Sequence, residues 1–226
     1  MKKGFKLLLV VFITLLVFSG CGKKDKTNDE NNTKSELDVL NEKIKIEDMG
    51  IITGNYGVKS ILFKISNSNS MPLTVNTTVS LCDSSGKVLY SRDLYNYVGS
   101  YKYSYGVLLL DAEDEVFSKY KLDTKVSKDD LTDYDSIYSG INVSAFNNGK
   151  NVVVTFTNNS SRMVTPTATV LFLKGDKIVD VEEVTSYHLK SAGVDNININ
   201  YPMINSTTKM DYDKIQVMLK EVDLKL

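Results

Sequence analysis

The feature that most constrains the fold is an internal repeat. Ile61–Asn67 aligns with Val152–Asn158 at a shift of 91 positions, and a turn rich in Ser and Asn follows each segment. At the same shift, the first copy continues into Leu73–Leu81 and the second into Val164–Phe172. Because matching segments recur in the same order, we predict two modules of one fold.

Each module is predicted to be all-β. The segments are short, rich in Val, Ile, Thr, Tyr and Phe, and separated by turns at the spacing of a small sandwich. Alternation places one set of apolar residues on one strand face in each copy: Ile61, Phe63 and Ile65, then Val152, Val154 and Phe156. The predicted fold class is therefore all-β, with two tandem antiparallel immunoglobulin-like β-sandwich modules over residues 36–139 and 140–226. Helical spacing occurs only at Glu36–Lys45 and Lys128–Asp133.

A further match has a different shift and predicts an insertion. Asp133–Ile137 aligns with Asp211–Ile215 at a shift of only 78, which indicates an insertion at about residues 93–106 in the first module. Within it lie five candidate binding residues: Tyr95, Tyr97, Tyr101, Tyr103 and Tyr105. We expect a protruding hairpin that displays these rings to a ligand, since tyrosine offers a large contact area at low entropic cost. The alternative is that the rings pack on the module's own sheet.

The junction between the modules has no Gly-, Ser- or Pro-rich linker. Ser136–Phe146 ends the first copy and begins the second, where Gly140-Ile141 matches Gly50-Ile51. We therefore expect a nearly continuous strand across the junction and a semi-rigid rod, rather than two lobes around a cleft.

The N-terminus predicts a lipid anchor. Three lysines precede an apolar run from Leu7 to Phe18, which is too short for a spanning helix and typical of a secretory signal. The run ends in Ser19-Gly20-Cys21, which resembles the lipobox of bacterial lipoproteins, although Phe18 stands where that pattern prefers Leu. We predict a signal peptide over 1–20, diacylation at Cys21, and a flexible tether over 21–35. The expected location is the extracytoplasmic face of a cell membrane, and the composition fits a Gram-positive source.

Composition limits the chemistry. Loss of the three signal lysines changes the net charge from −1 to −4, which argues against nucleic-acid binding. We expect Cys82 to be a small buried apolar residue and the single histidine, His188, to lie in an exposed loop. The acidic runs Asp111–Glu115 and Asp129–Asp135 are interpreted as solvated turns, and calcium binding there stays open. We expect neither an enzyme, nor a cofactor, nor a metal site.

One family resemblance is present. Val79–Leu89 resembles the strand-turn-strand of FxLYD-type and related immunoglobulin-like domains of bacterial lipoproteins, with Cys82 in place of the preferred Tyr. Leu189–Gly193 resembles the Leu-Lys-Pro-Gly turn of that family without its proline. The resemblance covers residues 44–226, and it implies an immunoglobulin-like sandwich with a surface role and no catalytic residue.

The expected function is that of a membrane-anchored lipoprotein that binds a protein or a cell-wall glycan. The alternatives are a structural spacer, an accessory subunit of an envelope complex, or a solute-binding lipoprotein. The last alternative requires more helix than this sequence contains.

Overall fold

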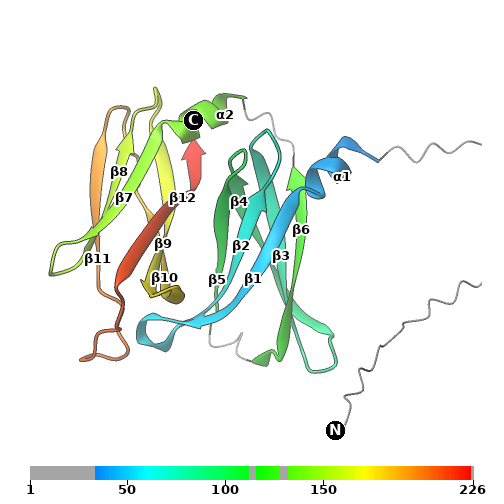
Figure 1. Ribbon diagram of the computed structural model, residues 1–226, viewed down its shortest axis with the longest axis horizontal. Helices are drawn as coiled ribbons and strands as arrows, with labels where there is room; N and C mark the ends of the chain where they lie inside the picture. Colours follow the sequence, from blue (N-terminus) through cyan, green and yellow to red (C-terminus); the bar gives the residue numbers. More distant parts are fainter. Residues whose placement is uncertain (1–33, 112–115, 128–131, 225–226) are drawn as a thin grey trace, which may run out of the picture. The chain divides into compact units, whose positions relative to one another are not determined.

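The computed structural model describes residues 34–111, 116–127 and 132–224. In these ranges the chain is almost entirely β-structure, with four antiparallel three-stranded sheets and two α-helices (Figure 1). This architecture confirms the predicted all-β sandwich fold. No helix of these ranges is long and apolar enough to cross a membrane. The predicted signal peptide, Cys21 and most of the predicted tether lie outside the described residues.

The first sandwich is made of two sheets, in the orders β1-β2-β5 and β4-β3-β6. Its strands are β1 (Ile44–Thr53), β2 (Lys59–Asn67), β3 (Leu73–Cys82), β4 (Val88–Val98), β5 (Tyr103–Leu109) and β6 (Lys119–Ser127). Helix α1 (Glu36–Asn41) precedes β1, and the short 3-10 turn η1 (Asn55–Gly57) joins β1 to β2. The predicted helix over Glu36–Lys45 is thus shorter than expected, because β1 begins at Ile44 by pairing with Asn67.

The second sandwich repeats this topology strand for strand. Its sheets have the orders β11-β8-β7 and β10-β9-β12, preceded by helix α2 (Thr132–Ser139). The strands are β7 (Ile141–Asn147), β8 (Val152–Asn158), β9 (Val164–Lys174), β10 (Lys177–Thr185), β11 (Val194–Ile199) and β12 (Lys214–Leu224). In each copy the first, second and fifth strands form one sheet and the other three form the second sheet, as in an immunoglobulin-like sandwich.

The two cores follow from the predicted alternation. Ile61, Phe63 and Ile65 of β2 pack with β3 residues in the first core. In the second core, Val152, Val154 and Phe156 occupy the equivalent positions on β8. All six side chains are fully buried, as their period-two spacing predicts.

A buried asparagine motif recurs at the shift of 91. The Asn67 side-chain amide donates to the carbonyl oxygens of Met71, Val98 and Gly99, at 2.9, 3.0 and 3.2 Å. The Asn158 amide donates to the carbonyl oxygens of three residues at 2.8, 3.0 and 3.1 Å. These residues are Arg162, Leu189 and Lys190, each 91 positions after its counterpart. The motif ties the same three backbone segments together in both modules.

The predicted insertion at about 93–106 is wrong. The shift stays at 91 through Ser100 and Ser191, whose hydroxyls donate to the carbonyl oxygens of Asn69 and Ser160 respectively. The match between Asp133–Ile137 and Asp211–Ile215 does not join equivalent elements. Asp133–Ile137 lies in helix α2, whereas Ile215 belongs to strand β12. The predicted hairpin is also absent from the described residues, because β4 pairs with β3 and β5 pairs with β2.

The predicted continuous strand at the junction is wrong as well. Residues 132–139 are helical, and β7 starts only at Ile141, which pairs with Asn158 as Ile44 pairs with Asn67. Contact between the modules is instead made by the outer faces of two sheets. Leu62 of β2 and Leu171 of β9 are both fully or almost fully buried in one cluster. The other buried members of this cluster are Tyr105, Val107, Leu173, Ile178 and Val181.

Candidate functional site

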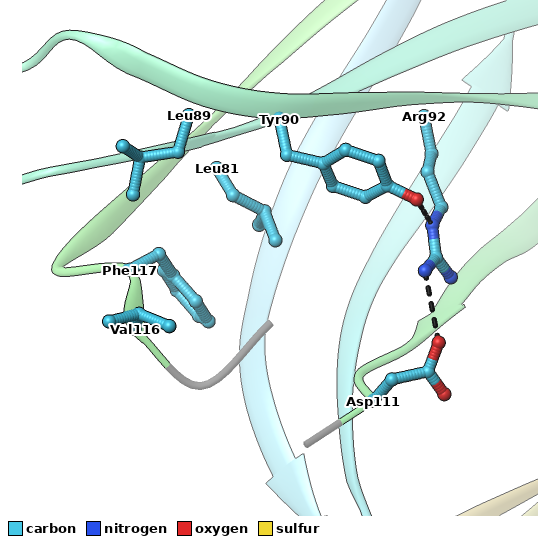
Figure 2. A pocket seen from close by; sticks show the side chains of 7 residues that line it. All are labelled: Leu81, Leu89, Tyr90, Arg92, Asp111, Val116 and Phe117. Carbon is cyan, nitrogen blue, oxygen red and sulfur yellow. Dashed lines mark hydrogen bonds and ion pairs between the residues drawn. The ribbon is translucent and has the colours of Figure 1, made fainter. Parts of the chain in front are cut away.

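A pocket of about 480 Å³ lies at the start of β4 (Figure 2). Its size falls within the range of small-molecule and side-chain binding pockets. The lining residues come from the end of β3, from β4, and from the described residues on either side of 112–115. They are Leu81, Leu89, Tyr90, Arg92, Asp111, Val116 and Phe117. We call the exposed segment Val88–Arg92 together with this pocket the β4 face.

The β4 face is apolar and exposed. The first four residues of β4 are all exposed, although they include Val88, Leu89 and Tyr90. Val116 on the opposite wall is 77% exposed, whereas Leu81 at the base belongs to the buried core. Large apolar side chains gathered at one exposed site commonly mark a binding surface.

A β-bulge aims the side chains of this strand. Leu81 pairs with Tyr90 and Cys82 with Val88, so Leu89 is left as an extra residue. A bulge of this kind bends the strand and re-aims its side chains. Tyr90 and Arg92 then lie two residues apart on one face, with the Arg92 guanidinium 5.0 Å from the centre of the Tyr90 ring.

Arg92 supplies the polar wall. Its Nε donates to the Tyr90 hydroxyl, and its Nη2 donates to Asp111 Oδ2 at 3.1 Å. Figure 2 shows this chain of contacts along one side, opposite Leu89, Val116 and Phe117. An apolar pocket with one oriented charged pair suits a ligand that offers an apolar group beside a polar one.

The second module carries the same surface at the same position. There Asp180 pairs with Phe172 and Ile178 with Leu173, which leaves Val179 as the extra residue. Because Leu81 and Phe172 match at the shift of 91, Asp180 corresponds to Tyr90.

In the second module this surface is occupied by the first module's own β1–β2 turn. The backbone N–H of Asn55 donates to Asp180 Oδ1 at 3.0 Å, and the Asn55 side-chain amide lies 3.5 Å from Glu182 Oε1. Asn55 Oδ1 accepts from the backbone N–H of Met203 at 2.9 Å. Burial raises the pKa of the Asp180 carboxyl, and burial together with the nearby Asp180 charge raises the pKa of Glu182. One copy of the surface therefore receives a loop within the molecule, while the β4 face receives none from the described residues.

The five candidate tyrosines are not gathered on one ligand face. Tyr97 is 3% exposed and donates to Asp135, and its ring lies 4.2 Å from that of Tyr138. Tyr105 is 7% exposed and belongs to the cluster between the modules. Tyr103 is 44% exposed, with its hydroxyl 3.2 Å from Gln216 Nε2. Tyr95 and Tyr101 are exposed, at 57% and 72%. Packing therefore accounts for Tyr97 and Tyr105.

The other singled-out residues have plain roles. Cys82 is completely buried, which confirms the prediction of a small core residue, and His188 lies in an exposed turn as expected. The acidic runs lie partly outside the described residues, at 112–115 and 129–131. In the described part of the chain, no group of three or more His, Cys, Asp or Glu side chains could hold a metal ion.

Sequence reasoning missed the β4 face. The sequence interpretation treats Val88 and Leu89 only as strand residues of the FxLYD-like segment Val79–Leu89, and it does not single out Tyr90. A usable signal was present, because three consecutive large apolar residues on the edge strand of a sheet cannot all face one core.

The comparisons with known proteins add little to this geometry. No family model matches the chain, and no curated protein matches it. Among solved structures, the crystal structure of red sea bream transglutaminase is similar over 85% of this chain and 33% of that one. The identity is 10% and the TM-score is 0.26. The chain thus spans about a third of the length of the transglutaminase chain.

This match corrects one expectation. The sequence predicted a protein that is not an enzyme, whereas the similar structure is that of an enzyme. The prediction is therefore withdrawn. A similarity with a TM-score of 0.26 does not assign an enzymatic activity to this chain either.

Proposed function

We propose that this chain is an extracytoplasmic lipoprotein, anchored through Cys21, that binds a protein partner through the β4 face. The observation that carries the proposal is the pair of equivalent surfaces in the two modules. Asp180 and Glu182 of the second module contact the β1–β2 turn of the first, and Tyr90 and Arg92 stand at the equivalent positions of the β4 face. A partner that offers a comparable turn would find an equivalent bulged strand with an apolar pocket beside it.

The chemistry of the pocket favours a protein over a cell-wall glycan. Leu81, Leu89, Val116 and Phe117 provide aliphatic and aromatic walls, and the polar groups are confined to one side. Apolar side chains that enter such pockets supply most of the free energy of many protein interfaces. The resemblance to FxLYD-type surface domains belongs to the same proposal.

The anchor is tested separately from the binding site. Full-length protein is expressed in a Gram-positive host with labelled palmitate, beside a Cys21→Ala variant. We expect label and membrane retention in the first and loss of both in the second. Palmitate incorporation into the Cys21→Ala protein would refute the assignment of the anchor.

The binding site is tested by blocking the pocket. Leu89→Glu and Val116→Glu each place a charge at the apolar mouth, and Val194→Glu is the control, since Val194 is 61% exposed on the second module. Cells are treated with a mild crosslinker, the proteins are purified, and partners are quantified by mass spectrometry. We expect a specific partner to fall about tenfold or more with the two pocket variants and not with the control.

Equal recovery of every partner from all three variants would contradict the binding proposal. That outcome would favour the structural spacer, because a spacer does not depend on the β4 face.

A further inference from the structure

The contact between the two modules has a direction. The β1–β2 turn of the first module is received by β10 of the second, through the contacts of Asn55 with Asp180 and Glu182. The second module has a turn of its own between β7 and β8, and its residues 148–150 are exposed. The first module has its own receiving surface, the β4 face, which is exposed as well. Each copy of the chain therefore presents a turn on its second module and a receiving surface on its first.

The β7–β8 turn satisfies its own backbone. Asn147 Oδ1 accepts the backbone N–H of Gly149 at 2.8 Å. Asn148 Oδ1 accepts the backbone N–H groups of Lys150 and Asn151, both at 2.9 Å. Because these N–H groups are bonded within the turn, a receiving surface has to contact its side chains instead. A turn that is already held in one conformation also loses little entropy when it binds.

Two side chains of this turn are available for such a contact. Phe146, directly before the turn, is 53% exposed and pairs with Val153 of β8. Val153 matches Leu62 at the shift of 91, and Leu62 contacts the second module, so Phe146 lies on the equivalent outer sheet face. Lys150 adds an exposed positive charge at the tip. Since β7 has 7 residues where β1 has 10, the turn is shorter, and its contact has to come from these longer side chains.

The β4 face is suited to the same two side chains. The carboxylates that receive the β1–β2 turn in the second module have no counterpart here, because Tyr90 and Arg92 stand at their positions. Apolar surface is exposed instead, with Val88 at 46% and Leu89 at 52%. The Asp111 side chain is 71% exposed although it is bonded to Arg92, so it can also contact an ammonium group. An apolar surface beside a carboxylate matches an aromatic ring beside a lysine.

We propose that the partner of the β4 face is a second copy of this chain, which binds through its β7–β8 turn. Phe146 of one copy packs on Val88 and Leu89 of the next. Lys150 of the first copy lies beside Asp111 of the second. This inference rests on the proposed function, because it names the partner of the same face.

The contact joins two different surfaces, so it repeats. Each copy that receives a turn still has its own β7–β8 turn to offer, and the copies join head to tail into a chain or a ring. A single turn buries less surface than a stable complex needs. The association is therefore weak, and it depends on the crowding of copies on the membrane.

Disulfide trapping between two differently tagged full-length copies tests this arrangement in the cell. One copy carries Lys150→Cys, and the other carries Val116→Cys at the mouth of the pocket; the native Cys82 is completely buried. Under mild oxidation we expect a dimer with both tags, at about tenfold or more the yield of a control pair in which Val194→Cys replaces Lys150→Cys. Val194 is 61% exposed, but it pairs with Thr157, at the end of the sheet away from the turn.

Two further changes test the direction of the contact. The tagged dimer should persist when Phe146→Ser is added to the Val116→Cys copy and Leu89→Glu to the Lys150→Cys copy, because one intact turn and one intact face remain. The same two changes placed the other way round should abolish the dimer. Phe146 and Leu89 are more than half exposed, so circular dichroism should show that every variant is folded.

The proposal is overturned if the tagged dimer forms no more often than with the Val194→Cys control. It is equally overturned if both arrangements of Phe146→Ser and Leu89→Glu crosslink alike. If Leu89→Glu then still reduces the recovery of a different protein, the β4 face keeps its proposed function and only the second copy is excluded. If no protein depends on Leu89, both proposals fail.

Discussion

Replacing the repeated asparagine should destabilise the two modules by similar amounts. In each module one buried amide donates to three carbonyl oxygens, at 2.9–3.2 Å for Asn67 and 2.8–3.1 Å for Asn158. The side-chain oxygen of each also accepts a backbone N–H, from Asn69 at 2.8 Å and from Ser160 at 2.9 Å. Asn67→Ala and Asn158→Ala therefore remove equivalent contacts.

The magnitude follows from the groups left without partners. A net hydrogen bond contributes about 1 kcal/mol, and a buried polar group left unsatisfied costs about 1–3 kcal/mol. Two of the three bonds in each module are only part-buried, so water can replace the amide there, and we expect each substitution to cost about 2–4 kcal/mol. For a chain of this length that corresponds to a fall in Tm of roughly 4–16 °C.

Urea unfolding followed by circular dichroism measures both variants. The control is Asn196→Ala, because Asn196 is exposed and makes only a surface contact with the Thr155 hydroxyl at 2.7 Å; it should cost less than about 0.5 kcal/mol. A loss below about 1 kcal/mol for either buried asparagine would show that its hydrogen bonds contribute little to the stability of the module. So would a large loss in one module and none in the other, since the motif would then have different roles in the two copies.

Two further predictions concern packing and pH. Gly106→Ala should cost several kcal/mol in thermal unfolding, because a Cβ there would lie 2.1 Å from Phe63 Cζ in the core; an unchanged Tm would contradict this packing. Burial raises the pKa of Tyr134 to about 12, and it also raises the pKa values of Tyr97 and Tyr138. The neutral phenol is favoured in the fold, so this stabilisation is fully present below pH 10 and is lost as the pH rises through 12. Absorbance at 295 nm should show several tyrosines that ionise only as the protein unfolds, whereas full ionisation near pH 10 with the fold intact would exclude the buried cluster.

Local turn chemistry explains why most strands could be predicted. The segment Asp83–Lys87 contains a glycine at a φ of +92°, and the Asp83 carboxylate accepts the backbone N–H of Lys87 at 3.0 Å. These short-range contacts fix the turn between β3 and β4 without help from the rest of the chain. The alternating core residues of β2 and β8 were equally predictable, since period two alone determines their face.

The errors at the junction arose because helix and strand patterns overlap in short segments. Residues 136–146 alternate well enough to suggest one strand, but α2 buries Ile137 and places Tyr138 against Tyr97. That packing involves residues far apart in sequence, so a local pattern could not anticipate it. The choice between helix and strand was made by tertiary contacts.

The contact between the modules could be predicted in part from the sequence of β9. β9 contains four consecutive large apolar residues, Val170–Leu173, and all are buried, because one face meets its own core and the other meets the first module. A continuous apolar run of this kind indicates a strand covered on both sides. The run Val88–Tyr90 at the start of β4 is the weaker signal, because three apolar residues on an edge strand indicate that one of them faces outward but not that a pocket lies beside it.

Partner binding at the β4 face can be tested directly with a photo-activated crosslinker placed at single positions in the living cell. A crosslinking amino acid at position 89 lies in the mouth of the pocket, and one at position 194 lies on an exposed site of the second module. We expect one discrete protein adduct from position 89, which is lost when Arg92 is changed to Ala, and no adduct from position 194. Adducts of the same pattern from both positions, or no adduct from position 89, would contradict the claim that the β4 face binds a protein partner.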